Sequence, residues 1–349
     1  MPKTREMVLI CSGNAGQLRW KLDFQRVVKD SGSMMLGREV KKIIFFAVLA
    51  MTLTMPMVSM AQSSLDGRLV GTEKQGDARM LAMGGALRAS NSNTSAVYLN
   101  PAAMGMAHVY HLNVKYQYTG LDKLHNGGLA IVDSITHHIL SAGVSLDYLR
   151  AAREDSDFKS LDIRLAGAVN IREVFFVGVT GRFLRVAHDV ESGSVGPNRL
   201  PALPKNGDAM QASGLTLDVG LAAKLGDIVS IGLTASNISD TGSLYAPIEL
   251  GGGIAALIKN IWLLELDLIA DFTSYEKTEM ALQLGTEFIL KQQFSFRGGF
   301  DREFHFDVSS YSLGFGYATT RFAVDLGFKQ DIEYIERFRI ALGFRFFIG

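Results

Sequence analysis

Cysteine and recognisable catalytic motifs are both scarce in this sequence. Its 349 residues include one cysteine, Cys11, which lies close to the N-terminus. A single cysteine cannot form a disulfide framework within the chain, and a mature protein without its N-terminus would have no thiol chemistry. The Gly-x-Ser-x-Gly motif of many serine hydrolases does not occur either. These absences exclude a disulfide-stabilised scaffold and leave no motif for nucleophilic catalysis.

The full sequence also has no net charge. The full sequence has 35 Lys and Arg residues against 35 Asp and Glu residues. Residues 1–61 hold nine basic and four acidic residues, so the remainder carries 26 basic and 31 acidic residues and a net charge of −5. No basic stripe remains that could follow a phosphate backbone. The composition therefore excludes a nucleic-acid partner.

Only one apolar run approaches the length of a membrane-spanning helix. It covers Ile43–Val58, about 16 residues, whereas a spanning helix needs ~20. Three basic residues, Arg38, Lys41 and Lys42, precede the run, and the small-residue triplet Ser59–Ala61 follows it. This order is typical of a cleaved signal peptide. The alternative is a transmembrane anchor.

The signal peptide sets the expected start of the mature chain. We predict that it covers residues 34–61 and is cleaved after Ala61, so that Gln62 becomes the first residue. Residues 1–33 show no periodicity and precede a pair of methionines. We therefore predict that residues 1–33 are an extension from an upstream start codon and that the protein is exported.

From Val109 to the C-terminus the sequence alternates with a period of two, in fourteen strand-like segments. Residues i and i+2 of a strand lie on one face, so this alternation predicts strands with one apolar and one polar face. In the last segment, 338–346, bulky apolar residues alternate with arginine, alanine and glycine. Segments 126–134 and 174–188 alternate least regularly.

The connections between these segments alternate between long and short, with 189–210 among the long ones and 172–173 among the short ones. Bacterial outer-membrane barrels have this pattern of loops and turns. The alternative, a soluble all-β protein, would have to fill the interior of a barrel that is too wide for side chains. We therefore predict an all-β fold, a 14-stranded antiparallel transmembrane β-barrel over residues 109–349.

Residues Gly76–Gly105 do not alternate, and we interpret them as a plug inside the barrel. Asp77–Ala89 has good helix propensity but is interrupted by Gly84-Gly85. Asn100 followed by Pro101 predicts a helix start, with asparagine as the N-cap. The plug segment as a whole is expected to cover residues 62–108. The alternative is an ordinary N-terminal helix and turn.

The plug also carries a family resemblance. The run Gly-Asp-Ala-Arg-x-Leu-x-Met-Gly-Gly-Ala and the later Ala-x-Tyr-x-Asn-Pro-Ala are similar to the N-terminal signature of the PorV/PorQ-type outer-membrane proteins, which are relatives of the FadL fatty-acid transporters. Ala103 stands where that family usually has glycine. The matching residues are Gly76, Asp77, Ala78, Arg79, Leu81, Met83, Gly84, Gly85, Ala86, Ala96, Tyr98, Asn100, Pro101 and Ala102.

Charged residues of both signs lie on the polar faces of the predicted strands. We expect these charges to pair across strands or to face water, in a structural network that also holds the plug in place. The alternative is that Arg297, Arg339 and Arg345 bind an anionic ligand head in the lumen by charge-assisted hydrogen bonds. His108 and His111 are three apart, which places them on opposite faces of a strand and unable to share a metal ion. We predict no metal site, no cofactor and no catalytic residue, with an outer-membrane lipase as the alternative, because a triad is recognised by geometry.

Two functions are consistent with this sequence. The PorV/PorQ resemblance implies a barrel that supports protein export to the cell surface beside a type IX secretion machinery, with the Pro-rich loop Asp189–Met210 as the surface for a protein partner. The alternative is a FadL-like transporter of long-chain fatty acids or other hydrophobic compounds through a plugged lumen. Either function implies contact with outer-membrane lipid and, besides it, secretion proteins or a hydrophobic small molecule as the partner.

Overall fold

In the computed structural model, residues 75–120, 123–152, 157–188, 210–239, 245–274, 278–304 and 307–348 are described. They belong to one compact unit, Met60–Gly349. The extension 1–33, the signal peptide 34–61 with its cleavage before Gln62, and most of the loop Asp189–Met210 lie outside the described residues, so those predictions stay predictions.

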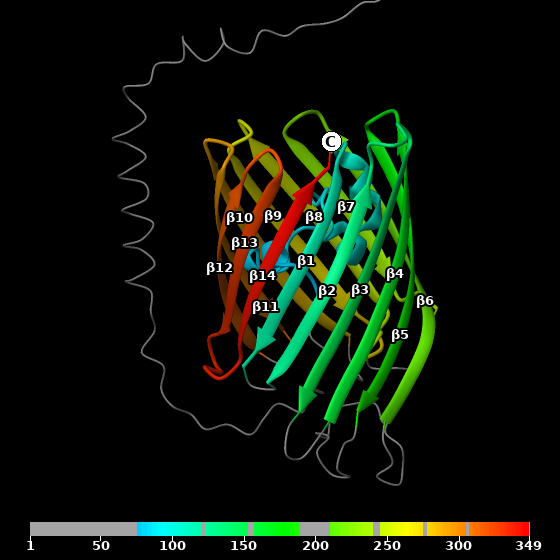
Figure 1. Cartoon of the computed structure of the whole chain (residues 1–349), viewed down its shortest axis with the longest axis vertical. Helices are drawn as coiled ribbons and strands as arrows, with labels where there is room; N and C mark the ends of the chain where they lie inside the picture. The colour runs from blue at the N-terminus through cyan, green and yellow to red at the C-terminus, as the bar shows by residue number, and fades with distance from the viewer. Residues whose placement is uncertain are drawn as a thin grey trace, which may run out of the picture. The chain divides into compact units, whose positions relative to one another are not determined.

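Fourteen antiparallel strands form a closed barrel in which each strand pairs with its neighbours in sequence and β14 pairs with β1 (Figure 1). The fold class predicted from the alternation is confirmed. The strands are β1 Tyr110–Thr119, β2 Leu124–Asp133, β3 Leu140–Ala152, β4 Asp157–Ile171, β5 Phe175–His188, β6 Met210–Leu225, β7 Val229–Ser236, β8 Glu249–Ile258, β9 Trp262–Asp271, β10 Glu279–Leu290, β11 Phe294–Glu303, β12 Val308–Ala318, β13 Phe322–Asp331 and β14 Phe338–Phe347.

All fourteen predicted segments correspond to strands, including the two irregular ones, which became β2 and β5. The boundaries differ most at β6, because the sequence alternates clearly only over residues 215–221 whereas the strand covers Met210–Leu225. Gly214 and the pair Ala222-Ala223 explain the difference, because small residues give no contrast between an apolar and a polar face.

Bulky apolar side chains lie on the outside of the barrel, and polar side chains lie in the lumen. On β14, Leu342 is 46% exposed whereas its neighbour Ala341 is 2% exposed. On β1, Lys115 is buried and Tyr116 is exposed. This is the inverse of a soluble protein and is the arrangement of a transmembrane barrel, in which lipid contacts the bulky face.

Tight turns close one end of the barrel. The pairs Arg172-Glu173, Lys259-Asn260 and Lys291-Gln292 all have positive φ angles, between 52° and 59°. Two consecutive left-handed residues are typical of a type I′ turn, whose twist matches that of paired strands. The longer connections lie at the opposite end, as the sequence predicted, and we call the two ends the turn end and the loop end.

The plug lies inside the barrel, where Figure 1 shows its helices in blue and cyan behind β1 and β14. It contains α2 (Ala78–Ala82), α3 (Ala96–Leu99) and the 3-10 helix η2 (Pro101–Met106). The helical propensity of Asp77–Ala89 is realised only in its first part, because Gly84 and Gly85 adopt φ angles of 68° and 93° and end the helix. No helix of the described residues is long and apolar enough to cross a membrane.

Candidate functional site: the plugged lumen

Glycines of the inner wall lie where the plug backbone comes closest to the strands. A Cβ added at Gly178 would collide with Ala102, and one added at Gly327 would collide with Ala78. The wall and the plug backbone therefore touch directly, and any larger side chain would displace the plug. Further glycines of this kind, on β6, β7, β11 and β12, are Gly220, Gly232, Gly299 and Gly314.

One row of ion pairs joins α2 to the wall. Arg79 binds Glu287 on β10 through Nε at 3.1 Å and Nη2 at 2.7 Å. Arg297 on β11 binds the other oxygen of Glu287 at 2.7 Å and also binds Asp325 on β13 at 2.7 Å. Arg345 on β14 completes the row with a 2.7 Å contact to Asp325. Three arginines thus alternate with two carboxylates, and every group in the row has at least one partner of opposite charge.

Arg79 keeps its charge in this setting. Burial on its own would lower the pKa of the Arg79 guanidinium, but Glu287 raises it by charge attraction and by a hydrogen bond, and the net effect is upward. The side chain also donates to Asn91 Oδ1 at 3.4 Å. Asp77, another signature residue, caps α2 by accepting a hydrogen bond from Met80 N at 2.9 Å. Gly76 packs against Met80, with no room for a larger side chain.

A second anchor lies at the turn that follows α2. Asp267 on β9 accepts hydrogen bonds from the backbone amides of Leu87 and Arg88, and from Arg88 Nη1, each at 3.1 Å. Glu265, on the same face of β9, accepts from the amide of Ala89 at 2.6 Å and from the Ser90 hydroxyl. Two carboxylates of one strand therefore satisfy the amide groups of a whole plug turn.

Asn100 joins the two halves of the plug and fixes both to the wall. Its Oδ1 accepts a hydrogen bond from Ala102 N at 3.2 Å, which confirms the predicted N-cap, with Pro101 as the first residue of η2. Its Nδ2 donates to Arg88 O at 2.8 Å and to Leu221 O on β6 at 3.1 Å. The side chain is fully buried, so these hydrogen bonds replace all of its contacts with water.

Tyr98 forms the third anchor, on the opposite side of the lumen. Its hydroxyl donates to Asp147 on β3 at 2.7 Å, and Lys115 on β1 binds the other Asp147 oxygen at 2.7 Å. The Lys115 ammonium also lies 4.0 Å from the centre of the Tyr98 ring, within the range of a cation–π interaction. Burial raises the pKa of Tyr98, and the Asp147 carboxylate raises it further, so the hydroxyl stays a donor.

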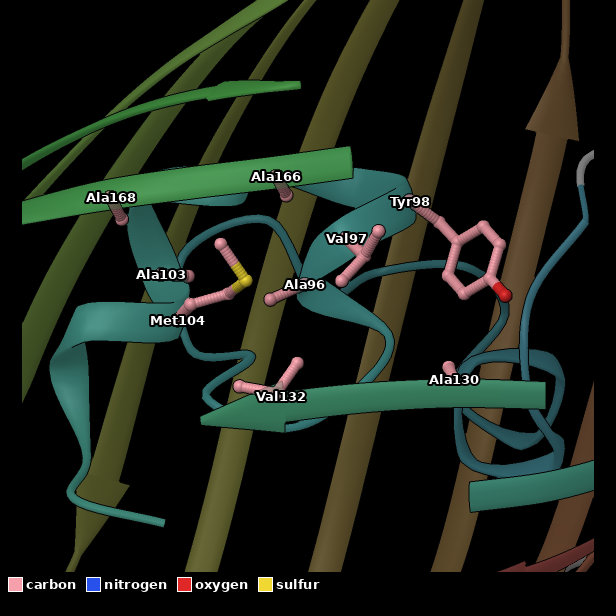
Figure 2. Close-up of a cluster of buried hydrophobic side chains, with 9 residues drawn as sticks. All are labelled: Ala96, Val97, Tyr98, Ala103, Met104, Ala130, Val132, Ala166 and Ala168. Carbon is pink, nitrogen blue, oxygen red and sulfur yellow. The ribbon is translucent and has the colours of Figure 1, made fainter. Parts of the chain in front are cut away.

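Apolar contacts complete the seat of the plug (Figure 2). Val97 from α3 and Met104 from η2 lie beside Val132 of β2, and Tyr98 extends away from this group. All three aliphatic side chains are fully buried. Short alanine side chains on β2, β4 and the plug allow this close approach: Ala96, Ala103, Ala130, Ala166 and Ala168.

A separate apolar cluster lies at the loop end of the lumen. It combines inward residues of β2–β5 with Tyr245 and Ala246 from the connection between β7 and β8, and Phe158 lies 5.8 Å from Tyr245, between ring centres. We call it the mouth cluster. Its other members are Leu124, Leu149, Ala151, Leu184 and Val186. Each of these side chains is at most 6% exposed, so the mouth cluster is packed on itself and forms an apolar layer at the loop end of the lumen.

The three arginines proposed as ligand contacts occupy different settings. Arg297 and Arg345 both bind Asp325, as described above. Arg339 is half-buried near the loop end and forms no ion pair within the described residues. It lies across from Lys329, which binds Asp301 at 2.8 Å. Arg339 and Arg345 are six residues apart on β14, about 20 Å, so the three side chains do not converge on one ligand.

Several residues at the centre of this arrangement were not singled out from the sequence. Arg88 lies in an irregular turn, and the β9 pair Glu265 and Asp267 shows only as two polar positions of an alternating strand. The mouth cluster is the other omission, because its members come from five separate segments. A signal was available in part: Leu124, Leu149 and Leu184 are leucines on the inward, otherwise polar face.

No family model matches this sequence, and no curated protein matches it in sequence. Solved structures do resemble the barrel. The toluene transporter TbuX of Ralstonia pickettii has a TM-score of 0.61 and 12% identity, over 80% of this chain and 100% of that one. The CymD monoaromatic hydrocarbon channel has a TM-score of 0.59 and 13% identity, over 78% and 97%.

A FadL homologue of Pseudomonas aeruginosa has a TM-score of 0.52 and 11% identity, over 78% of this chain and 96% of that one. These proteins are 14-stranded outer-membrane barrels of the FadL family. At such low identities the likeness establishes the fold, and it gives no support to the PorV/PorQ kinship that the plug motif implied.

Proposed function

We propose that this protein lies in the outer membrane and passes small hydrophobic molecules from the loop end of its lumen past the plug. The mouth cluster carries this proposal. Burying apolar surface of a ligand there would release about 25 cal/mol per Å² of apolar area. A hydrophobic molecule could enter by separating the side chains of this cluster, which are at most 6% exposed and pack on one another.

The neighbours in structure support this proposal over protein export. The printed titles of TbuX and CymD describe a toluene transporter and a monoaromatic hydrocarbon channel. The secretion hypothesis rested on the plug motif, and its residues Asp77, Arg79, Tyr98 and Asn100 all form hydrogen bonds or ion pairs within the barrel. That motif is therefore explained by seating the plug, without a secretion partner.

The plug is the barrier on the proposed route through the lumen. Arg79, Arg88, Tyr98 and Asn100 bind it to the wall by side-chain hydrogen bonds and ion pairs, and buried apolar side chains and small residues pack the rest of it against the wall. A hydrophobic molecule held in the mouth cluster would lie on the loop side of these anchors. Passage then requires a local rearrangement of the plug, which costs less than unfolding the barrel.

Arg339 allows a test of whether the transported molecule carries a carboxylate. A carboxylate head could bind the Arg339 guanidinium while its apolar tail follows Thr119 and Leu124, which are successive cross-strand neighbours of Arg339, towards the mouth cluster. A neutral hydrocarbon would not use Arg339. We therefore expect Arg339→Gln to reduce uptake of a fatty acid and to leave toluene uptake unchanged if both are cargo.

The central experiment compares uptake of labelled toluene and of a labelled fatty acid by cells with and without the protein. Leu184→Asn, which places an amide in the mouth cluster, should lower uptake of both several-fold. Arg185→Gln is the matched control, because Arg185 is the next residue on β5 and points outward. Equal uptake by cells that carry the wild-type protein and by cells that carry Leu184→Asn would contradict the proposal. So would a deletion strain that loses proteins from its surface but takes up both compounds as before.

A further inference from the structure

The outer wall of the barrel carries a hollow of about 510 Å³ across β8–β11. Cross-strand partners define its shape. One row of bulky side chains is Ile254, Leu266, Leu284 and Phe300. Two residues further along, the row is smaller on β8, β10 and β11, with Ala256, Thr286 and Gly298, whereas β9 keeps a leucine, Leu264. The next row is bulky again and includes Trp262 and Phe296. We call the depression along the middle row the outer trough.

The dimensions of the outer trough match one extended hydrocarbon chain. Rows two residues apart are about 7 Å apart along a strand, and neighbouring strands are ~4.8 Å apart. The two bulky rows are therefore about 14 Å apart between backbones, and their side chains narrow the space between them. Across four strands the trough extends about 14 Å. It is a narrow slot with bulky walls.

The outer trough presents no charged group and one hydroxyl to an occupant. Thr286 is the one polar residue of its small row, and Thr286 Oγ1 already accepts a hydrogen bond from Trp262 Nε1 at 2.7 Å. The carboxylate of Glu265 points inward, to the plug. A ligand that needs a charge partner would gain nothing here.

The wall behind the outer trough is unusually thin. Gly285 and Gly299 are cross-strand partners on the lumen side, and Gly84 of the plug packs on the backbone of Phe300. Around Gly298 the wall therefore consists of backbone with few side chains. If the trough were empty, the atoms of this thin wall would lack van der Waals contacts on their outer side. An occupant that fills the trough therefore stabilises this part of the wall.

The surroundings identify the occupant. The outer trough is continuous with the apolar belt that faces lipid, since Ile254, Leu266 and Leu284 are all exposed on the outside. A second copy of the protein would need an interface of roughly 1,200–2,000 Å², far more than a slot of this size provides. We propose that the outer trough binds one acyl chain of a membrane lipid at a defined site. This inference does not depend on which cargo crosses the lumen.

Trp262 makes the site measurable. The sequence has two tryptophans, Trp20 and Trp262, so the full chain with Trp20→Phe has a single indole, beside the trough. The folded protein in a non-ionic detergent is titrated with phosphatidylcholine that carries bromine atoms at mid-chain, which quench tryptophan fluorescence on contact. We expect quenching that saturates at one lipid per barrel.

Gly298→Leu fills the outer trough without straining the wall, because an added Cβ would meet Thr286 Cγ2 at 3.6 Å and Ser312 O at 4.0 Å. It should weaken the saturable quenching at least about tenfold. Gly167→Leu is the matched control, an outward glycine of β4 with no atom within 4 Å of an added Cβ, and should leave the quenching unchanged. Ala256→Leu tests the same slot if Gly298→Leu does not fold.

Two results would overturn the assignment. Quenching that never saturates and is equal in wild type, Gly298→Leu and Ala256→Leu would mean that lipid contacts this wall without a defined site. A barrel that is dimeric in detergent and becomes monomeric on Gly298→Leu would assign the outer trough to a second copy of the chain.

Discussion

Arg79 in the plug and Arg297 in the wall bind opposite oxygens of one carboxylate, that of Glu287, each at 2.7 Å. Glu287 therefore holds the plug and the wall with the same group. Removing Arg79 leaves Glu287 still paired with Arg297, so the wall keeps its charge balance. The plug alone loses a contact, which makes Arg79 suitable for separating plug opening from barrel folding.

We expect Arg79→Met to lower the free energy of opening the plug by about 1.5–3 kcal/mol, the contribution of hydrogen bonds to a charged group. The barrel should still fold, as judged by heat-modifiable migration on gels. Conductance in planar bilayers should rise. Arg79→Lys, which keeps the charge but loses the two-nitrogen contact, should give an intermediate conductance, and an unchanged conductance in Arg79→Met would contradict the anchoring role.

Asn100→Ala should also loosen the plug while leaving the barrel assembled. It removes a helix cap of roughly 0.5–2 kcal/mol and leaves the buried carbonyl groups of Arg88 and Leu221 without their donor. Hydrogen exchange of residues 75–107 should speed up, with the strands unaffected. Deletion of Gly76–Gly105 gives the limiting case; if that deletion folds and conducts like wild type, the plug is not the barrier in the lumen.

Gly327→Val should displace α2, because the new side chain would occupy the place of the Ala78 backbone. Overpacking of this kind costs about 1–3 kcal/mol. Gly167→Val, outward on β4, is the matched control and should have no effect on the plug. Limited proteolysis of the plug in the folded barrel distinguishes the two variants, and equal cleavage rates would argue against direct contact between glycine and plug.

The two faces of β14 should respond differently to polar substitution. Leu342→Arg places a charge against lipid and should cost ~2–4 kcal/mol near the membrane midplane. Gly343→Ser should be mild, because an added Cβ there meets its nearest atoms, in Ala78 and Asn113, at 3.7 Å. Urea unfolding in lipid vesicles measures both. Similar losses at the two positions would mean that inside and outside are assigned wrongly.

Alkaline pH should open the plug through Tyr98. The pKa of Tyr98 is raised in the folded protein by burial and by Asp147, so its stabilising effect is complete below the unfolded value of about 10. It is lost as the pH rises through the higher folded value. Wild-type conductance should therefore increase at strongly alkaline pH, and Tyr98→Phe should lack that step; an identical pH profile in both proteins would exclude Tyr98 as the cause.

The strands could be predicted from the sequence because the alternation of apolar and polar residues within a strand does not depend on which strands lie beside it. In β14 and β1 this alternation is visible in the sequence of each strand alone. The N-cap of Asn100 was predictable for the same reason, since a cap contacts residues two or three positions away. Gly84-Gly85 signalled an interruption, although the sequence did not indicate that the helix would stop there.

The anchors of the plug could not be predicted, because they depend on which inward side chains lie at the same level of the barrel. Arg297 and Asp325 are 28 residues apart and meet only through the registers of β11–β13. The sequence predicted that inward charges pair across strands, as Arg297 and Arg345 do with Asp325, but it did not indicate which carboxylate binds which arginine. Tyr245 joins the mouth cluster from a loop, where no periodicity exists.

The pairing of β1 with β14 also determines the order of events during assembly. It joins the two ends of the strand series, so it has the largest sequence separation of any pair in the wall and is expected to form last. Contacts such as Gly178 with Ala102 and Gly327 with Ala78 place the plug backbone directly against two parts of the wall, with no space between them. Because the plug directly precedes β1, we expect the wall to close around a plug that is already in place.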